Sequence, residues 1–270
     1  MRFFSRQASL DISERLRIES RLRAALVEGG FNLVYQPIID LATGMMAGVE
    51  ALCRWRDPEL GDVSPGRFVP IAEQSELAQV LGRWVQEAVC RQLVEWQAHH
   101  GCRIPVAVNV APAELQRPDF AEELLARLSE RELDAGLLWL EVTERSLVED
   151  TPNLRNNLER LSEARVHISI DDFGTGYSSL SYLGRLPLSA LKIDRSFVGG
   201  VPAGEREAAL VRSIINMADA FGIVTVGEGV ETRAQLDYLI AQGCHFAQGF
   251  FIATPATADE ILSMHERPLV

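Results

Sequence analysis

Short runs rich in apolar and β-branched residues recur along the chain and alternate with stretches whose apolar residues follow helical spacing. Strand alternating with helix this often predicts a largely parallel sheet covered by helices. The segments with helical spacing include residues 10–27, 120–132, 205–221 and 233–243. The runs that predict strands are residues 31–39, 46–55, 104–111, 137–144, 167–172, 190–194, 222–229 and 245–252.

The connection between the first two predicted strands differs from the others. Only the six residues DLATGM separate these strands, whereas a parallel crossover needs about ten to twelve residues. The first strand is therefore expected to pair antiparallel with the second, through a turn centred on Thr43–Gly44. Eight strands in one chain of this length favour an α/β fold, a (β/α)8 TIM-type barrel with the first strand antiparallel to the others.

The composition is that of an ordinary globular protein, and it narrows the classes of partner. Of the 270 residues 47% are hydrophobic, and no apolar run approaches the ~20 residues of a membrane span. The start MRFFSRQASLDISERLR lacks the apolar core of a secretory signal, and the four scattered cysteines are expected to be reduced thiols. A formal net charge of −12 argues against binding to nucleic acid or anionic lipid. We therefore expect a soluble cytoplasmic segment with no nucleic-acid polymer as partner and no membrane contact.

Polar residues interrupt the apolar runs near the carboxyl ends of the last seven predicted strands. In a barrel these strand ends meet at one mouth, where active sites are built. One such residue alone is most often a satisfied core or capping residue, but a whole set at matching positions predicts a site. The set is Glu50, Asn109, Glu141, Asp171 with Asp172, Lys192 with Asp194, Glu228 and Gln248, and the reversed first strand adds Gln36.

The carboxylates of this set indicate bound divalent cations. Several converging carboxylates without cations would raise one another's pKa and destabilise the fold. Oxygen donors suit Mg²⁺ or Mn²⁺ better than zinc, and the adjacent Asp171 and Asp172 could hold two ions, as in two-metal phosphoryl chemistry. Lys192 could orient or polarise an attacking water. The pattern therefore predicts a metal-dependent hydrolase of phosphate esters.

Other motif readings have little support. DDFG, at residues 171–174, is shared with the metal-binding tripeptide of kinases, but no H-R-D loop accompanies it. GTGYSS, at residues 174–179, is not followed by the Gly-Lys-Ser/Thr of a phosphate-binding loop. The five histidines have no metal-ligand spacing, and the four tryptophans are expected in the core.

The motifs resemble those of the EAL-domain cyclic di-GMP phosphodiesterases. They lie in the family's order over roughly residues 20–256, nearly the whole chain. The resemblance implies hydrolysis of cyclic di-GMP to linear pGpG in bacterial second-messenger signalling, with two Mg²⁺ or Mn²⁺ ions per site. The motifs are YQPI (35–38), EAL (50–52) followed by Arg54, VNVA (108–111), EVTE (141–144), DDFGTGYSSL (171–180), KID (192–194), EGVE (228–231) and QGF (248–250).

The resemblance also implies a role for each matching residue. The catalytic residues would be Lys192, Glu228, Glu50 and Asp171, and Lys192 would contact the attacking water. The metal ligands would be Glu50, Asn109, Glu141 and Asp171 for the first ion. Asp171 and Asp172, with Glu228 directly or through water, would hold the second. The substrate would be bound or lined by Gln36, Leu52, Arg54, Asp194, Glu231 and Gln248, with Arg54 clamping a phosphate.

The loop after Asp172 is expected to couple the metal site to a partner surface. In the family this loop helps to hold the metal site and contributes to a homodimer interface with an adjacent helix. Its two glycines permit backbone angles closed to other residues. The loop residues carried over are Glu144, which anchors the loop, and Phe173, Gly174, Thr175 and Gly176.

Three divisions of the chain follow. Residues 1–19 would be a linker or helix start from an upstream GGDEF or sensory domain, 20–256 the barrel, and 257–270 a C-terminal helix and tail. A natural standalone domain stays open as the alternative. Two residues depart from the family's pattern: Gly227 stands where Ala is frequent, and Thr254 where a basic residue precedes the closing proline.

Other functions for the same residues stay open. A cyclic di-GMP receptor without hydrolysis is the alternative from a different class, although such receptors usually lose an acidic ligand and this chain loses none. Activity toward pGpG or other cyclic dinucleotides is a third possibility. The active phosphodiesterase is the leading hypothesis.

Overall fold

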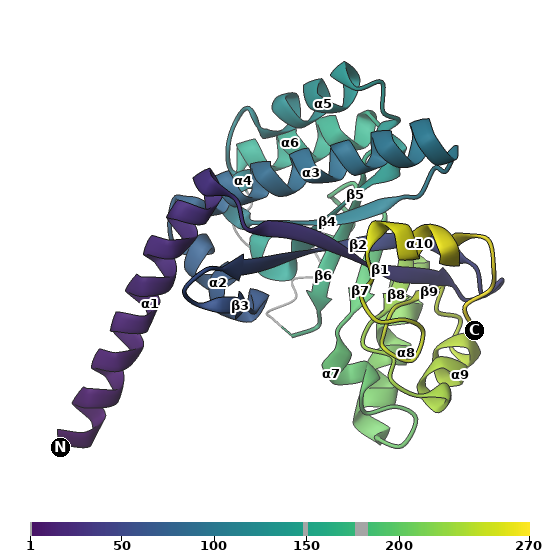
Figure 1. The fold of residues 1–270 in the computed structure, drawn as a ribbon. Coiled ribbons are helices and arrows are strands. Elements are labelled where there is room, and N and C mark those ends of the chain that lie inside the picture. Colours follow the sequence, from purple (N-terminus) through teal and green to yellow (C-terminus); the bar gives the residue numbers. More distant parts are fainter. Residues whose placement is uncertain (1, 148–150, 176–182) are drawn as a thin grey trace.

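The protein is a barrel of strands surrounded by helices (Figure 1). The computed structural model describes residues 2–147, 151–175 and 183–270, with residues 2–12 as backbone only. Along the described chain the strands are β1 (Phe31–Asp40), β2 (Met46–Asp57), β3 (Gly61–Val63), β4 (Val106–Val110), β5 (Leu138–Thr143), β6 (His167–Phe173), β7 (Ala190–Ile193), β8 (Val224–Gly227) and β9 (Phe246–Ala247).

The helices fill the connections between the strands. Short 3-10 turns span Ala135–Leu137 and Glu144–Leu147. The α-helices are α1 (Arg2–Glu28), α2 (Pro65–Glu73), α3 (Leu77–His100), α4 (Pro112–Leu115), α5 (Phe120–Glu130), α6 (Pro152–Glu163), α7 (Arg195–Val198), α8 (Glu205–Ala220), α9 (Arg233–Ala241) and α10 (Ala258–His265).

The sheet closes in the predicted way. Its order is β1-β9-β8-β7-β6-β5-β4-β2, and β1 pairs back onto β2. β1 runs antiparallel to both neighbours, and the other adjacent pairs of the barrel are parallel. The turn that allows this reversal lies where it was expected: Asp40 Oδ1 accepts the N–H of Thr43, and Gly44 has a φ of 71°. The TIM-type barrel with one reversed strand is confirmed.

Strand alternation separates a helix-facing layer from the barrel interior. Leu140, Ile168 and Leu191 have no exposed surface and pack among the hydrophobic residues under the helices. Their neighbours Glu141 and Lys192 therefore point to the inside of the barrel, because successive side chains of a strand face opposite sides. This alternation brings polar groups from separate strands together.

Several boundaries differ from the sequence-based expectation. β8 and β9 are shorter than the predicted strands 222–229 and 245–252, so Glu228 and Gln248 lie just beyond the strand ends. α1 starts well before residue 10. The strand β3 was not predicted. It forms because Asp57, at the end of β2, accepts the N–H groups of Glu59 and Leu60 and so turns the chain back along β2.

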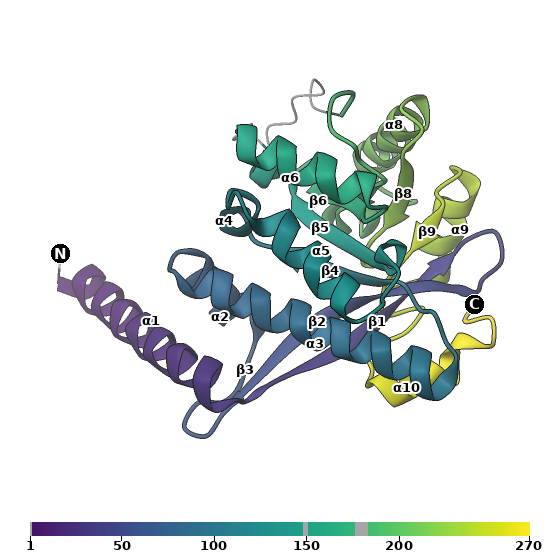
Figure 2. The ribbon, with the colours of Figure 1, turned by 90° about the horizontal axis from the view of Figure 1, so that it is seen from above.

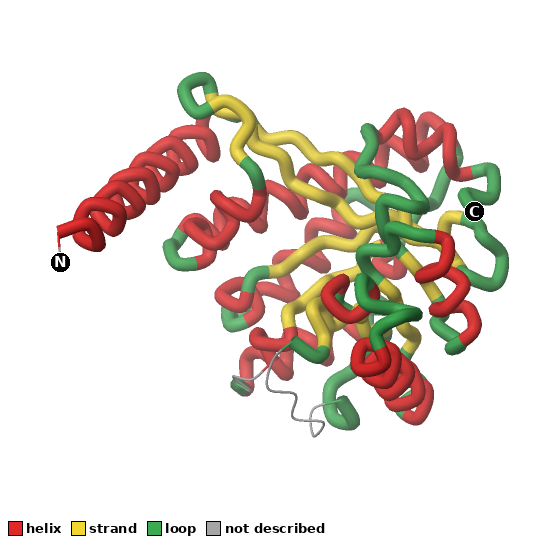
Figure 3. The backbone as a smooth tube through the Cα atoms, turned by 90° about the horizontal axis from the view of Figure 1, so that it is seen from below, coloured by secondary structure: helices red, strands yellow, loops and turns green. Residues whose placement is uncertain are grey.

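The helices lie around the barrel, and α1 extends from its side. Figure 3 shows the strands running through the interior with helices outside them. Figure 2 shows α1 projecting away from the body at one end of the molecule. Arg21 of α1 donates to Asp57 Oδ2 at 2.9 Å, which ties α1 to β2. In the part of the chain that is described, no helix has the length and apolar character to cross a membrane.

The C-terminal segment packs on the barrel through α10 and the residues after it. α10 contacts β1, and Leu269 N–H donates to Gly44 O at 2.9 Å in the β1–β2 turn. Thr254 is exposed in the preceding loop.

Gly227 fits its site because Leu239 of α9 occupies the space beside it. A Cβ at residue 227 would lie 2.4 Å from Leu239 Cδ1, and Leu239 is fully buried. Gly227→Ala should lower the free energy of unfolding by about 1–3 kcal/mol because the core becomes overpacked. Combined with Leu239→Val, about 1 kcal/mol of that loss should be recovered, measured by urea unfolding. Gly66→Ala, at an open helical site, is the control and should not destabilise. If the losses in free energy of unfolding from Gly227→Ala and Leu239→Val simply added in the double variant, contact between these two residues would not be the cause.

Candidate functional site

Lys192 is the centre of a buried charge cluster at the mouth of the barrel. Its side chain is 1% exposed. Its Nζ lies 2.7 Å from Glu228 Oε1, 2.8 Å from Glu141 Oε1 and 3.2 Å from Asp171 Oδ1, with Glu50 Oε2 at 3.7 Å. One ammonium group therefore faces four carboxylates in a water-poor interior, where charge interactions are strong.

Five strands supply these groups. Glu50 comes from β2, Glu141 from β5, Asp171 from β6 and Lys192 from β7, and Glu228 follows β8 directly. The carboxyl ends of parallel strands meet at one rim, so residues far apart in the chain converge there. The structure thus brings together the carboxylates and the lysine that the sequence singled out.

A chain of amide hydrogen bonds orients Glu50. Asn109 Nδ2 donates to Glu50 Oε1 at 2.8 Å, and Gln248 Nε2 donates to Glu50 Oε2 at 2.8 Å. The Gln248 amide also lies 3.0 Å from Gln36 Oε1, and Gln36 donates to Ala253 O. Gln36 and Gln248 therefore act on the carboxylate of Glu50, which leaves its two oxygens fixed in direction.

Asp171 and Asp172 are neighbours in sequence, yet both reach the acidic cluster. Adjacent residues of a regular strand point to opposite faces. Here the pairing of β6 with β7 is irregular between Ile170 and Phe173, and Asp172 has a φ of 54°. This left-handed conformation is uncommon for a residue other than glycine and is typical of functional sites. The distortion places ligand oxygens of Asp171, Asp172 and Glu228 within 4.8 Å of one another.

The donor atoms fit hard divalent cations. The cluster offers carboxylate oxygens, and Asn109, which donates its amide N–H to Glu50, keeps its carbonyl oxygen for a ligand. Mg²⁺ and Mn²⁺ prefer oxygen donors of this kind, whereas structural zinc prefers thiolate and imidazole. The residues present therefore fit the predicted metals.

Burial and mutual repulsion raise the pKa values of three carboxyl groups in the cluster. Burial and the charge of Glu50 raise the pKa of Glu141 well above its usual range. Burial, against the opposing effect of Lys192, raises the pKa of Glu228 to about 8. Burial and the charges of Asp171 and Asp194 raise the pKa of Asp172 to about 6. Protons on these groups would compete with any bound cation.

The neighbours of Lys192 and Glu50 favour the charged forms of these two groups. Burial opposes the charged form of Lys192, but Glu141, Glu228, Glu50 and Asp171 outweigh burial and raise the pKa of the lysine well above its usual value. Burial also opposes ionisation of Glu50. The charge of Lys192 and the hydrogen bonds from Gln248 and Asn109 overcome burial and lower the Glu50 pKa. Lys192 and Glu50 are therefore both ionised at neutral pH.

A cavity of about 370 Å³ opens above the acidic cluster. Asp194 lines this cavity, and it also caps α7 by accepting the N–H of Ser196 at 3.0 Å. Glu231 lines the same cavity and is exposed. Sequence reasoning missed Arg195 and Phe250, which also line it. Phe250 is 65% exposed, so its side chain is open to solvent beside this cavity.

Leu52 and Arg54 line a different cavity. It has a volume of about 380 Å³ and lies between β2 and the helices α2 and α3. Asn109 belongs to its wall and hydrogen-bonds Glu50, which lines the acidic cavity, so the two cavities adjoin at this pair. Arg54 is half-buried and donates to Cys53 O at 3.0 Å. The expected substrate mouth is thus divided in two.

The described start of the loop after Asp172 is hydrogen-bonded to Glu144. Buried Glu144 accepts the N–H of Gly174 at 3.0 Å, and Gly174 has a φ of 94°. Thr175 Oγ1 donates to Asp172 O at 2.8 Å, and Phe173 is buried. Gly176 lies outside the described residues. The anchor therefore connects the loop directly to the strained Asp172.

Lys192, which the sequence singled out, is also the only lysine among the 26 lysine and arginine residues. One further informative residue escaped the sequence interpretation. Glu114 is a buried carboxylate in the second cavity. It accepts the N–H of Ala111 and the amide of Gln86, and burial raises its pKa to about 7. Its position in PAEL, just after the Asn109 strand, resembles an ordinary helix start and gave no signal.

Comparison with known proteins agrees with this geometry. The family model described as "EAL domain" matches residues 19–255. Cyclic di-GMP phosphodiesterase NbdA of Pseudomonas aeruginosa is 42% identical over 253 residues, which cover 94% of this chain and 32% of that protein. An uncharacterised protein of Mycobacterium tuberculosis is 40% identical over 260 residues, covering 95% of this chain and 42% of that protein.

Solved structures agree as well. The structure titled "PaMucR Phosphodiesterase, c-di-GMP complex" has a TM-score of 0.85 and 39% identity, covering 91% of this chain and 99% of that one. The EAL domain of Mycobacterium smegmatis DcpA has a TM-score of 0.76 and 36% identity, covering 89% and 99%. The chain spans less than half of the length of the curated relatives named above. With the family model matching most of its residues, the chain belongs to the EAL domain family.

Proposed function

We propose that the chain is a metal-dependent phosphodiesterase that hydrolyses cyclic di-GMP to linear pGpG. The observation that carries this proposal is the cluster of Asp171, Asp172 and Glu228 around the buried Lys192, at the mouth of an EAL-domain barrel. A relative named as a cyclic di-GMP phosphodiesterase and a structure titled as a cyclic di-GMP complex support the choice of substrate.

Two Mg²⁺ or Mn²⁺ ions would be held by six side chains. They would lower the pKa of a water molecule and neutralise charge on the scissile phosphate. The ligands would be Glu50, Asn109, Glu141 and Asp171 for one ion, and Asp171, Asp172 and Glu228 for the other.

The protein's own groups hold the reacting atoms in place. The amides of Asn109 and Gln248 fix the Glu50 carboxylate, and Gln36 supports Gln248. Lys192 is charged and immobile among its carboxylate partners, so its ammonium can donate a hydrogen bond to the attacking water and orient it toward phosphorus. The residues proposed for catalysis are Lys192, Glu228, Glu50 and Asp171.

The two adjoining cavities suit a ligand with two bases and two phosphates. Each has a volume of about 370–380 Å³, and the Glu50–Asn109 pair lies between them. Arg54, with Leu52 beside it, would bind a phosphate in the second cavity, because a guanidinium fork matches phosphate oxygens. Asp194 and Glu231 would line the first cavity with Gln36 and Gln248.

The proposed partners extend beyond this segment. The loop after Asp172 and an adjacent helix would form a homodimer contact, which the anchor between Glu144 and Gly174 supports by fixing the start of the loop. An upstream GGDEF or sensory domain would precede α1, in keeping with relatives more than twice as long.

The proposed compartment is the cytoplasm, where thiols stay reduced, as the four free cysteines are.

Turnover tests the proposal directly. Incubated with cyclic di-GMP and Mg²⁺ or Mn²⁺, the purified chain should yield pGpG, separated by chromatography. Glu50→Ala removes a metal ligand and should slow the reaction by ~100-fold or more. Glu59→Ala, at an exposed glutamate of the β2–β3 hairpin, is the control and should retain the rate. Binding without any product under both metals would favour a receptor, and a Glu50→Ala rate within about twofold would refute the metal assignment.

Lys192→Ala should separate binding from chemistry. Cyclic di-GMP binding, measured by calorimetry with Mg²⁺ present, should persist, because the ions and Arg54 would still hold the phosphates. Turnover should fall by ~100-fold or more, since the group that orients the water is lost. Added ethylamine should restore part of the rate by filling the vacated space with an ammonium group. Equal losses in binding and rate would show that Lys192 serves only to build the site.

The raised pKa of Glu228 predicts a pH-dependent stability for the metal-free chain. Between its ordinary value of 4.5 and about 8, the folded state keeps a proton that the unfolded state has released. The melting temperature should therefore fall as the pH rises from about 6 to about 8.5. Saturating Mg²⁺ should reduce this fall, because the cation replaces the proton. Glu228→Gln should weaken the pH dependence of the metal-free chain, and an unchanged slope in this variant would count against the assignment.

A further inference from the structure

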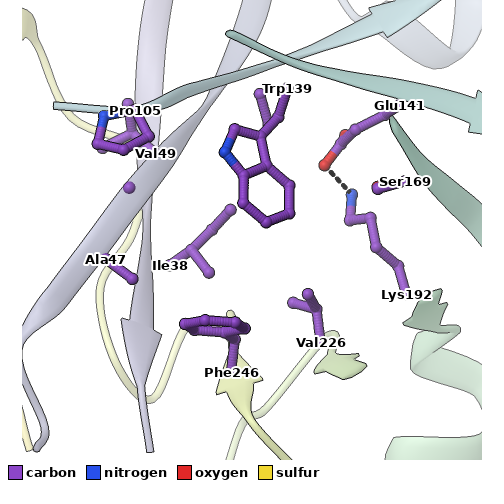
Figure 4. A pocket seen from close by; sticks show the side chains of 12 residues that line it. Ile38, Ala47, Val49, Pro105, Trp139, Glu141, Ser169, Lys192, Val226 and Phe246 are labelled. Atoms are coloured by element: carbon purple, nitrogen blue, oxygen red, sulfur yellow. Dashed lines mark ion pairs between the residues drawn. The ribbon is translucent and has the colours of Figure 1, made fainter. Parts of the chain in front are cut away.

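A third, smaller cavity, here called the floor cavity, lies inside the barrel beneath Lys192. Its volume is about 90 Å³, and none of its lining residues belongs to the acidic cavity at the mouth. Figure 4 shows Lys192 and Glu141 meeting along one side, with Trp139, Ile38 and Phe246 on the others. Trp139 stacks on His167 with 4.5 Å between ring centroids. The lining residues Ala47, Pro105 and Trp139 come from the amino-terminal ends of the parallel strands, so the Lys192–Glu141 layer separates this floor cavity from the mouth.

Two polar atoms of the floor cavity's wall lack a partner. Ser169 Oγ and Glu141 Oε2 are buried and make no hydrogen bond within the described part of the chain. Each of these residues is 2% exposed. A buried polar atom without a hydrogen bond costs about 1–3 kcal/mol, so such atoms call for a partner. Since both residues line the same cavity, one partner in that cavity could serve both atoms.

The two atoms are placed to share one water molecule. Glu141 and Ser169 are paired across β5 and β6, so their side chains stand side by side on the interior face. The Ser169 hydroxyl can donate to a water, which in turn can donate to the carboxylate oxygen. A cavity volume of about 10–15 Å³ is enough to hold one water molecule. The floor cavity, at about 90 Å³, is large enough.

We propose that an ordered water in the floor cavity bridges Ser169 Oγ and Glu141 Oε2, and that Ser169 is thereby a positioning residue for Glu141. Glu141 Oε1 pairs with Lys192 at 2.8 Å, so the water holds the second oxygen of a carboxylate whose first oxygen is already fixed. The bridge keeps this carboxylate from rotating away from the cation site. This role rests on the proposed function, since it concerns a ligand of the metals.

A high-resolution crystal structure of the metal-free chain tests the water. Electron density should show one ordered water within hydrogen-bonding distance of both Ser169 Oγ and Glu141 Oε2. A floor cavity without such a water would overturn the inference, whatever the chain does with cyclic di-GMP. A water in this position would stand even if the chain proved to bind no metal, so this arm is independent of the proposed function.

Metal affinity tests the positioning role. Mn²⁺ alone, titrated by calorimetry, should bind Ser169→Ala about fivefold more weakly than the unchanged chain. Ser169→Thr keeps the hydroxyl and should bind normally. The control is Thr225→Val, which removes a fully buried strand hydroxyl that contacts His245 outside the floor cavity. Equal Mn²⁺ affinity in Ser169→Ala would overturn the role even if the variant melts at a lower temperature. Absence of binding by the unchanged chain would instead contradict the proposed function.

The single lysine supplies a spectroscopic readout for the same variants. Selective ¹⁵N-lysine labelling should give one side-chain signal, from Lys192 Nζ. That signal should shift in Ser169→Ala, because Glu141 loses its water and repositions against the ammonium, and it should stay in place in Thr225→Val. An unmoved signal in Ser169→Ala would show that the hydroxyl does not position Glu141.

Discussion

The ammonium group of Lys192 balances only part of the charge that the barrel gathers around it. Four carboxylates lie within 3.7 Å of its Nζ, and Asp172 stands beside them. With all five ionised and one lysine charged, the cluster carries a formal charge of −4, which two divalent cations would cancel. The metal-free protein can relieve this excess only by keeping protons, as the raised pKa values of Glu141, Glu228 and Asp172 express. Repulsion among these carboxylates thus lowers the stability of the metal-free fold, and the same carboxylates give the cluster its capacity to bind cations.

This charge balance also bears on how an anionic substrate reaches an acidic protein. The chain carries a formal net charge of −12, so long-range attraction cannot bring in a ligand with two phosphates. Local neutralisation must do so, and the acidic cluster proposed to hold cations and the guanidinium of Arg54 lie at the two adjoining cavities where it would act. Screening at physiological ionic strength confines the remaining repulsion to about 8 Å, so a neutralised mouth can bind phosphate despite the overall charge.

The barrel and most of the acidic ring were predictable from sequence, because strand ends in a parallel barrel converge and a six-residue link forces a reversal. Other features depend on geometry that no local pattern encodes. The irregular pairing that turns Asp172 toward the site appears as an ordinary strand end in ISIDDF. The hairpin with β3 depends on Asp57 accepting backbone N–H groups, and the division of the mouth into two cavities depends on how α2 and α3 pack beside Arg54. The homodimer contact, the upstream domain and the individual ligand roles remain predictions.

Strand alternation links the two sides of the lysine layer. On β6, Ser169 and Asp171 face the interior two residues apart, the first toward the floor cavity and the second toward Lys192 and the acidic cluster. Glu141, on the neighbouring strand, has one oxygen paired with Lys192 and one without a hydrogen bond to any described residue. A carboxylate on a regular strand, such as Glu141, can therefore be held from the mouth side by Lys192 and from the floor cavity through Ser169. This requires a polar residue at the position of Ser169. The adjacent irregularity at Asp172 supplies what regular alternation cannot, a second carboxylate on the same side. The site is thus built from one rule of strand geometry and one local exception to it.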